Sequence, residues 1–170
     1  MHIERNTSRT EIFEQVRAWL NLEGFLIQRQ DMTRPWGGFF VLEESQIDKF
    51  RKRFFPEVTF SESQLKNKLS PKILLVAPES RLSWQYHHRR SEIWKLIAGE
   101  GGVVTSQSDE EGPLQILRLD QVVRLAQGER HRLVGLSNWG VVAEIWMHTD
   151  PGNPSDEADI VRVQDDFKRT

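Results

Sequence analysis

The chain contains no cysteine among its 170 residues. Neither a disulfide framework nor a thiolate metal site can form, so any metal ion must be held by histidine, carboxylate or amide groups. No apolar run approaches the roughly 20 residues that a membrane-spanning helix needs, and Met1–Ser8 lacks the apolar core of a signal peptide. The 23 basic residues do not outnumber the 25 acidic ones, whereas nucleic-acid binders normally carry a basic excess. We therefore expect a soluble cytoplasmic protein that binds neither nucleic acid nor a membrane.

A chain of this length forms about one domain with a sizeable core, and we predict a single domain over residues 1–170. Residues 1–33 are expected to form a helix and a strand. Ser8 and Glu11 have the spacing of a capping box, Gly24 is a plausible helix stop, and apolar residues between them share one helical face: Ile12, Phe13, Val16, Trp19 and Leu20. This face is expected to pack on the remainder of the chain or across a dimer.

Residues 34–170 carry the strands, interrupted by a charged insertion at Glu44–Asn67. Within the insertion we predict a short helix at Ser45–Phe54 and a loop or lid after it. Two strands precede it, at Phe25–Arg29 and Gly38–Glu43. The strands predicted after it are Lys72–Ala77, Leu82–Tyr86, Ile93–Ala98, Val103–Gln107, Leu114–Leu119, Val122–Leu125, Arg132–Leu136 and Val141–His148, with a short element at Ile160–Phe167. Many short strands separated by turn residues such as those at 99–102, 138 and 140 indicate an all-β sandwich or barrel.

The chemistry concentrates around residues 83–94. Side chains alternate between the faces of a strand, so Gln85 and His87 share one face. Glu92, five residues past His87, can re-enter on the neighbouring strand, and His131 follows after a further set of strands. Two imidazoles, a carboxylate and an amide oxygen suit zinc, iron(II), manganese, cobalt or nickel. The spacing therefore predicts one divalent metal ion held by Gln85, His87, Glu92 and His131.

These residues resemble the two metal motifs of the cupin superfamily. The stretch Leu82-Ser83-x-Gln85-x-His87-His88-x-Arg90-Ser91-Glu92-x-Trp94 is similar to the cupin domain of type II mannose-6-phosphate isomerases. Further similar segments are Arg34-Pro35-Trp36-Gly37, His131-Arg132-Leu133, Asp159-Ile160-Val161-Arg162 and Asp165-Asp166-Phe167. The resemblance covers roughly Arg34–Arg169, apart from the insertion. It implies a double-stranded β-helix (jelly-roll) barrel, a metal ion that is expected to be zinc, and isomerisation of mannose 6-phosphate to fructose 6-phosphate.

Roles for individual residues follow partly from the resemblance and partly from the alternation of side chains along the strands. By family position, Arg90 and Lys72 are candidates to bind the sugar phosphate, and Arg90 also counts among the catalytic residues. Ser83 shares the face of Gln85 and could hydrogen-bond either the substrate or a neighbouring strand. Glu144 is the leading candidate for the general base. It shares a face with Val142, Trp146 and His148, and this face is expected to lie in solvent or in a polar barrel mouth, because the opposite face is uniformly apolar.

The chain also departs from the family pattern. Glu79 and Ser80 stand where a Pro-Gly turn is usual, and Arg89 and Ile93 stand where histidines are usual. Ile93 should face away from Glu92, so its identity bears on the substrate more than on the metal. The nucleotidyltransferase domain of the bifunctional members is not in this sequence.

Two other hypotheses stay open. The same ligands could bind a sugar or small acid for sensing, or support oxygen chemistry with iron(II). The chain could also be a structural protein with a relic site. Cupins of this kind commonly pair, so a homodimer is expected, with the apolar helix face and N-terminal strand as candidate interfaces.

Overall fold

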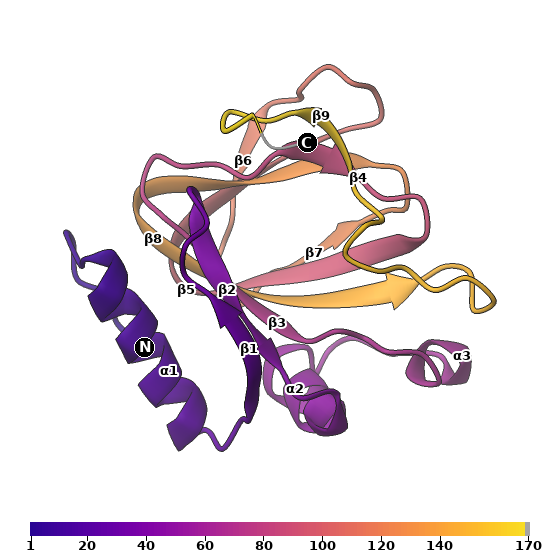
Figure 1. Ribbon diagram of the computed structural model, residues 1–170, viewed down its shortest axis with the longest axis horizontal. Helices are drawn as coiled ribbons and strands as arrows, with labels where there is room; N and C mark the ends of the chain where they lie inside the picture. The colour runs from indigo at the N-terminus through magenta and orange to yellow at the C-terminus, as the bar shows by residue number, and fades with distance from the viewer. Residues whose placement is uncertain (169–170) are drawn as a thin grey trace.

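An antiparallel β barrel with helices on its outside forms the computed structural model of the protein, which describes residues 1–168 (Figure 1). Arg169, the last residue of the family resemblance, lies outside the described residues. The helical elements are α1 (Arg9–Leu22), a 3₁₀ turn (Glu44–Gln46), α2 (Ile47–Phe54) and α3 (Glu62–Leu65). The strands are β1 (Ile27–Asp31), β2 (Gly37–Leu42), β3 (Lys72–Val76), β4 (Trp84–Tyr86), β5 (Arg90–Ser106), β6 (Leu114–Ile116), β7 (Val122–Leu125), β8 (Arg130–His148) and β9 (Val161–Gln164).

The two long strands, β5 and β8, connect the two sides of the barrel. They pair along their whole length, with β-bulges around Ala98 and Gly99. The amino-terminal half of β5 also pairs with β7 and its carboxyl-terminal half with β6. Likewise, β3 pairs with the second half of β8 and β4 with the first. Each long strand therefore contributes one half to each side of the barrel.

The sequence-based prediction of separate strands at 93–98 and 103–107, and at 132–136 and 141–148, was wrong. Gly99 has a φ of +72°, and a Cβ atom there would lie 1.8 Å from the carbonyl oxygen of Trp139. The glycine thus permits a bulge and a close approach of β8 within one continuous strand, not a tight turn. A glycine-rich stretch is equally compatible with a tight turn between two strands and with a bulge within one strand.

Two apolar clusters lie on opposite faces of the same strands. In β3, Ile73 and Leu75 face an outer cluster that contains the buried side of α1, whereas Leu74 and Val76 face an inner cluster. Residues of the inner cluster come from both sides of the barrel: Trp36, Phe39, Val41, Leu74, Val76, Leu82, Trp94, Leu96, Val103, Leu117, Leu125, Leu133 and Val142. Because helices cover the outer face, β2 and β3 are buried on both faces and show no polar alternation.

The N-terminal helix forms as its sequence predicts. Ser8 is the N-cap of α1, and Ser8 and Glu11 make the reciprocal bonds of a capping box. The apolar face of α1 packs within the chain, on the outside of the barrel (Figure 1). This packing is one of the two alternatives that the sequence left open.

The insertion at Glu44–Asn67 also packs on the outside of the barrel. Phe50, Phe54 and Phe55 of its helix and adjoining turn belong to the outer cluster, together with Val58 and Phe60. No described residue of this insertion lines the cavity inside the barrel. The insertion therefore thickens the outer core of the barrel. Among the described residues, no helix has the length and apolar character to cross a bilayer.

Candidate functional site

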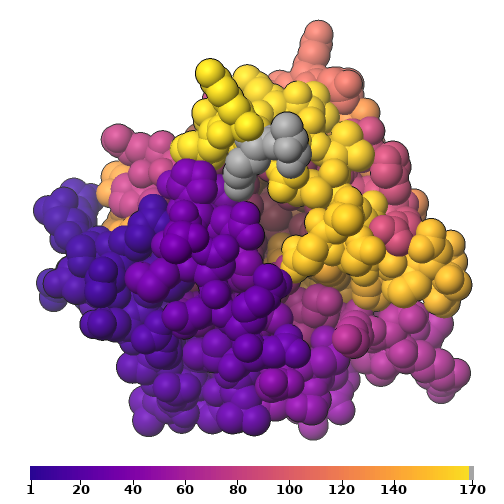
Figure 2. Space-filling view, in the orientation of Figure 1, coloured from indigo at the N-terminus to yellow at the C-terminus, as the bar shows by residue number. Residues whose placement is uncertain are grey.

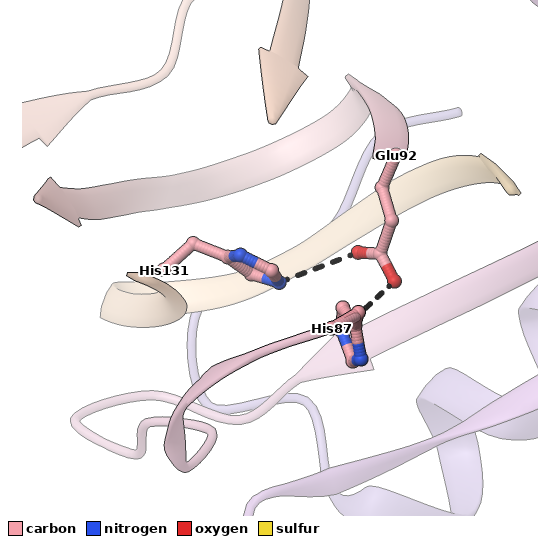
Figure 3. A group of neighbouring side chains, drawn as sticks. All are labelled: His87, Glu92 and His131. Atoms are coloured by element: carbon pink, nitrogen blue, oxygen red, sulfur yellow. Dashed lines mark ion pairs between the residues drawn. The ribbon is translucent and has the colours of Figure 1, made fainter. Parts of the chain in front are cut away.

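Three side chains that the sequence predicts as metal ligands converge inside the barrel. His87 directly follows β4, Glu92 is the third residue of β5, and His131 is the second residue of β8. Figure 3 shows the three side chains pointing toward one another. His87 Nε2 lies 3.2 Å from Glu92 Oε1, and His131 Nε2 lies 3.5 Å from Glu92 Oε2. All three are buried, and one ligand atom from each lies within 4.8 Å of the others.

The backbone fixes which nitrogen each histidine presents. His87 Nδ1 lies 2.5 Å from the carbonyl oxygen of Asp159, and His131 Nδ1 lies 2.9 Å from that of Glu129. Since a carbonyl only accepts, each Nδ1 carries a proton, and each Nε2 faces the centre of the group. His131 Nε2 is buried and has no hydrogen-bond partner among the described residues. An orphaned imidazole nitrogen beside a carboxylate and a second imidazole fits a divalent cation such as zinc.

Arg90 and the histidines keep Glu92 ionised. Burial by itself would raise the pKa of the Glu92 carboxyl, but its contacts with His87, Arg90 and His131 hold that pKa well below the ordinary value. Arg90 Nε donates to Glu92 Oε1 over 2.8 Å, and Arg90 Nη2 lies 3.1 Å from His87 Nε2. The carboxylate is therefore in the charged form that a cation requires.

The remaining donors of Arg90 are directed at the loop that joins β8 to β9. Arg90 Nη1 donates to Ser155 Oγ over 2.9 Å and to the carbonyl oxygen of Asp156 over 3.0 Å. The guanidinium carbon lies 3.6 Å from the centre of the Trp146 ring. These contacts differ from those expected of a phosphate ligand, because the side chain is buried and its donors already have partners within the chain.

Gln85 and Ser83 lie next to the three converging residues. Gln85 is opposite His131 in the β4–β8 register, and both Gln85 and Ser83 line the cavity inside the barrel. The Ser83 hydroxyl donates to Gln85 Oε1 over 2.5 Å. Ser83 was expected to bond the substrate or a neighbouring strand; in the structure its hydroxyl instead orients the amide of Gln85, two residues along the chain, and its role toward a substrate stays a prediction.

Glu144 points into the barrel interior, where two tryptophans hold it. Trp94 Nε1 donates to Glu144 Oε1 and Trp146 Nε1 donates to Glu144 Oε2, each over 3.1 Å. Trp94 Nε1 also lies 3.2 Å from Glu92 Oε2, so one indole connects the two carboxyl groups. Burial, and next the negative charge of Glu92, raise the pKa of Glu144 to about 7, while Lys72 and Arg90 act in the opposite direction.

Of the two places expected for the Glu144 face, solvent was wrong, because the face lines the polar cavity of the barrel. Only 5% of Glu144 is exposed. The opposite face of β8, with Val141, Ala143 and Ile145, packs in the outer cluster instead. Both faces are buried because the helices cover the outside of the barrel, and the polar face lines the interior.

A cavity of about 130 Å³ adjoins Glu92, one of the three converging residues. Its wall includes Ser83, Gln85, Arg90, Glu92, Trp94, Glu144, Trp146 and Lys72. Figure 2 shows a hollow between the N-terminal strands, in purple, and the C-terminal segment, in yellow. The predicted catalytic and substrate-binding residues therefore lie on one wall with Gln85 and Glu92.

Several residues at the site have no counterpart in the sequence-based prediction. No hydrogen-bonding role was predicted for Trp94 or Trp146, yet their indole nitrogens hold Glu144. Asp159 accepts from the backbone N–H groups of His88 and Arg89, and its carbonyl oxygen accepts from His87. The sequence signal that could have identified Asp159 was its position in one of the C-terminal segments that resemble the family.

Comparison with known proteins places these features in a family. The family described as "Mannose-6-phosphate isomerase C-terminal" matches residues 44–165. Two curated proteins, both named "Xanthan biosynthesis protein XanB" and both from strains of Xanthomonas campestris pv. campestris, are 29% and 28% identical over 126 residues. Each alignment covers 74% of this chain and 25% of the relative. The match thus spans about a quarter of the length of these relatives.

Solved structures share the fold at low sequence identity. The capsular polysaccharide assembling protein CapF from Staphylococcus aureus matches with a TM-score of 0.53 and 14% identity, over 82% of this chain and 32% of CapF. Vicilin from Solanum lycopersicum matches with a TM-score of 0.51 and 18% identity, over 78% of this chain and 35% of vicilin. These similarities show a cupin barrel, as the resemblance implied.

Proposed function

Because the chain belongs to the mannose-6-phosphate isomerase C-terminal family, we propose that it is a metal-dependent aldose–ketose isomerase of mannose 6-phosphate and fructose 6-phosphate. The observation that carries the proposal is the shared wall of one cavity. A carboxylate of the candidate metal group, Glu92, and a buried carboxyl with a pKa of about 7, Glu144, both line it. Proton transfer next to a carbonyl requires a cation that polarises the carbonyl and a base that titrates near neutral pH, and this cavity places candidates for both side by side.

The proposed cofactor is one divalent ion, with zinc as the first choice. His87, Glu92 and His131 would hold it, with the amide oxygen of Gln85 as a fourth ligand that Ser83 orients. When bound, the ion would supply positive charge that polarises the carbonyl oxygen of the substrate. The two backbone carbonyls behind His87 and His131 fix both rings in the tautomer that such an ion needs.

The proposed general base is Glu144. In the aldose-to-ketose direction its carboxylate takes the proton from C2 and returns it to C1, while the hydroxyl proton at O2 passes to O1, so that no atom is gained or lost. The indole N–H groups of Trp94 and Trp146 fix the position of both carboxyl oxygens. A base with a pKa near the working pH can both take and return a proton, which typically accelerates such a step by about 10²–10⁴-fold.

Lys72 and Arg90 have different proposed roles. Lys72 lines the cavity and is opposite Glu144 in the β3–β8 register, so its ammonium group is the proposed contact for the sugar phosphate. Arg90 is the proposed positioning residue, because it contacts Glu92, His87 and the loop before β9. Its charge also favours an anion in the cavity.

The first experiment combines elemental analysis of the purified protein with a coupled assay for conversion of mannose 6-phosphate to fructose 6-phosphate, with and without chelator. We expect about one metal ion per chain and turnover that the chelator abolishes and added metal restores. Metal-independent turnover would refute the proposed cofactor. Metal without turnover on this substrate would refute the proposed reaction while leaving the metal site in place.

The size of the cavity favours a second candidate function. Pockets for small molecules commonly measure roughly 300–1,000 Å³, and the cavity beside Glu92 measures about 130 Å³. A metal-binding cupin that holds a small acid, without isomerase activity, fits that volume. Calorimetric titration with small carboxylic acids, in parallel with sugar phosphates, distinguishes the two candidates.

We also propose a homodimer. The apolar face of α1 is covered within the chain, which removes one of the two interfaces expected from the sequence. Among the described strands, β1 pairs only with β2 and so keeps one free edge. That edge, with the exposed Leu26 beside it, is the remaining candidate interface.

A further inference from the structure

The side chain of Glu157 separates the cavity inside the barrel from a second cavity on the outside. The outer cavity measures about 340 Å³, and its wall includes Arg29, Lys68 and Ser70. Three residues line both cavities: Lys72, Trp146 and Glu157. The two spaces therefore meet at these three side chains.

Glu157 is held at this position by two cations. Lys72 Nζ donates to Glu157 Oε1 over 2.8 Å, and Arg29 Nη2 donates to the same oxygen over 3.3 Å. Lys72 Nζ also lies 3.7 Å from the centre of the Trp146 ring. Partial burial of its carboxyl would raise the pKa of Glu157, but Lys72, and then Arg29 and Arg90, hold that pKa below its ordinary value, so the group is anionic. A carboxylate thus occupies the point where two cations meet.

The two partners differ sharply in their access to water. The Lys72 side chain is 7% exposed, whereas the Glu157 side chain is 63% exposed. A buried ammonium group requires an anionic partner, because an unpaired charge in a poorly solvated site is costly. An exposed carboxylate loses little when it turns out into water. The anion opposite Lys72 is therefore exchangeable, whereas the lysine is fixed.

The backbone on both sides of Glu157 is firmly held. Ser155 Oγ donates to Asp159 Oδ2 over 2.7 Å, and the Ser155 N–H donates to His148 Nδ1 over 2.9 Å. Arg90 bonds the carbonyl oxygen of Asp156. Rotation of the Glu157 side chain alone, without movement of the loop, can therefore open the contact with Lys72.

We infer that Glu157 occupies the anion position of a phosphate subsite formed by Lys72 and Arg29, and that the phosphate group of an incoming sugar phosphate displaces it. This inference rests on the proposed function, since it concerns the phosphate end of that substrate. Displacement joins the inner cavity to the outer one, and together they fall within the roughly 300–1,000 Å³ usual for small-molecule pockets. Glu157 thereby selects against ligands without a strong anionic group, because only an anion replaces its carboxylate on Lys72.

Glu157→Gln tests the inference with inorganic phosphate as the probe and isothermal calorimetry on the full chain as the measurement. Removal of the competing charge should tighten phosphate binding by roughly tenfold. In the Glu157→Gln/Lys72→Met double variant the gain should disappear. Glu23→Gln, which breaks an exposed ion pair with Arg53 elsewhere, is the matched control and should leave the affinity unchanged.

Unchanged or weaker phosphate binding in Glu157→Gln would overturn the inference, and so would a gain that survives in the double variant. Glu157→Asp gives an independent check, because the shorter side chain keeps the charge but withdraws it from Lys72, and we expect a smaller gain in the same direction. Phosphate affinity is measured without turnover. A tenfold gain in phosphate affinity in a chain without isomerase activity would thus support the subsite and refute the proposed reaction. Isomerase activity without the gain in affinity would support the reaction and refute the subsite.

Discussion

Replacing Glu144 by glutamine should make the stability of the protein less sensitive to pH. Folding raises the pKa of this carboxyl from 4.5 to about 7, so the folded chain binds the proton more tightly than the unfolded chain does. The stability that the group contributes is therefore fully present below about pH 4.5 and is lost as the pH rises through about 7. At 1.36 kcal/mol per pKa unit, the loss amounts to about 3 kcal/mol.

Glutamine reproduces the shape of the protonated carboxyl and cannot ionise. In urea denaturation of chelator-treated protein, the free energies of unfolding of Glu144→Gln and the original chain should differ by less than about 1 kcal/mol near pH 5. At pH 8 the variant should be more stable by about 3 kcal/mol. A carboxylate with a depressed pKa that does not interact with Glu144, such as Asp159, destabilises both chains equally as the pH falls, so its contribution cancels in the difference.

Glu23→Gln is the control for this experiment. The pKa of Glu23 is lowered, chiefly by its hydrogen bond from Arg53, so this substitution should give a pH dependence of the opposite sign. A stability difference between Glu144→Gln and the original chain that stays constant from pH 5 to pH 8 would refute the reasoning. It would mean that the carboxyl is not desolvated in the folded state.

Two further predictions concern the site itself. His87→Ala and His131→Ala should each abolish stoichiometric zinc in elemental analysis and any isomerase activity, because the remaining ligands hold the ion poorly. The control variant His88→Ala, at an exposed position, should keep the metal. Full metal occupancy in His87→Ala and His131→Ala would contradict the assigned site. Trp94→Phe removes the indole N–H that Glu92 and Glu144 share, and it should lower the free energy of unfolding by about 1–3 kcal/mol. Unchanged stability at pH 8 would show that this N–H has no energetic role.

The sequence predicts the converging residues well because strand periodicity is a local property. Gln85 and His87 are two residues apart next to β4, and Glu92 is far enough along the chain to return on β5. Ile93 packs in the outer cluster, away from Glu92, as the alternation requires. The histidine and carboxylate positions follow from this alternation together with the resemblance.

The environment of Glu144 could not be predicted in the same way. A strand with one apolar and one polar face is expected to bury the apolar face and expose the polar one. Here α1 and the insertion cover the outer face, so the polar face of β8 is directed into the barrel. That outcome depends on packing between segments more than 80 residues apart, which local periodicity does not encode. The carbonyl oxygens behind the two histidines are invisible to sequence for a related reason, since every residue has one.

The bent strands β5 and β8 also bear on how the protein unfolds. Glu92 lies in the half of β5 that pairs with β7, and His131 lies in the half of β8 that pairs with β4. Each strand continues without interruption into the opposite side of the barrel, and the two are paired with each other throughout. Neither side of the barrel can therefore open independently, because opening one side would disrupt the paired strands β5 and β8, which continue into the other side. Loss of either metal-binding half should be cooperative with loss of the whole barrel, so that the site is either intact or absent in any given molecule.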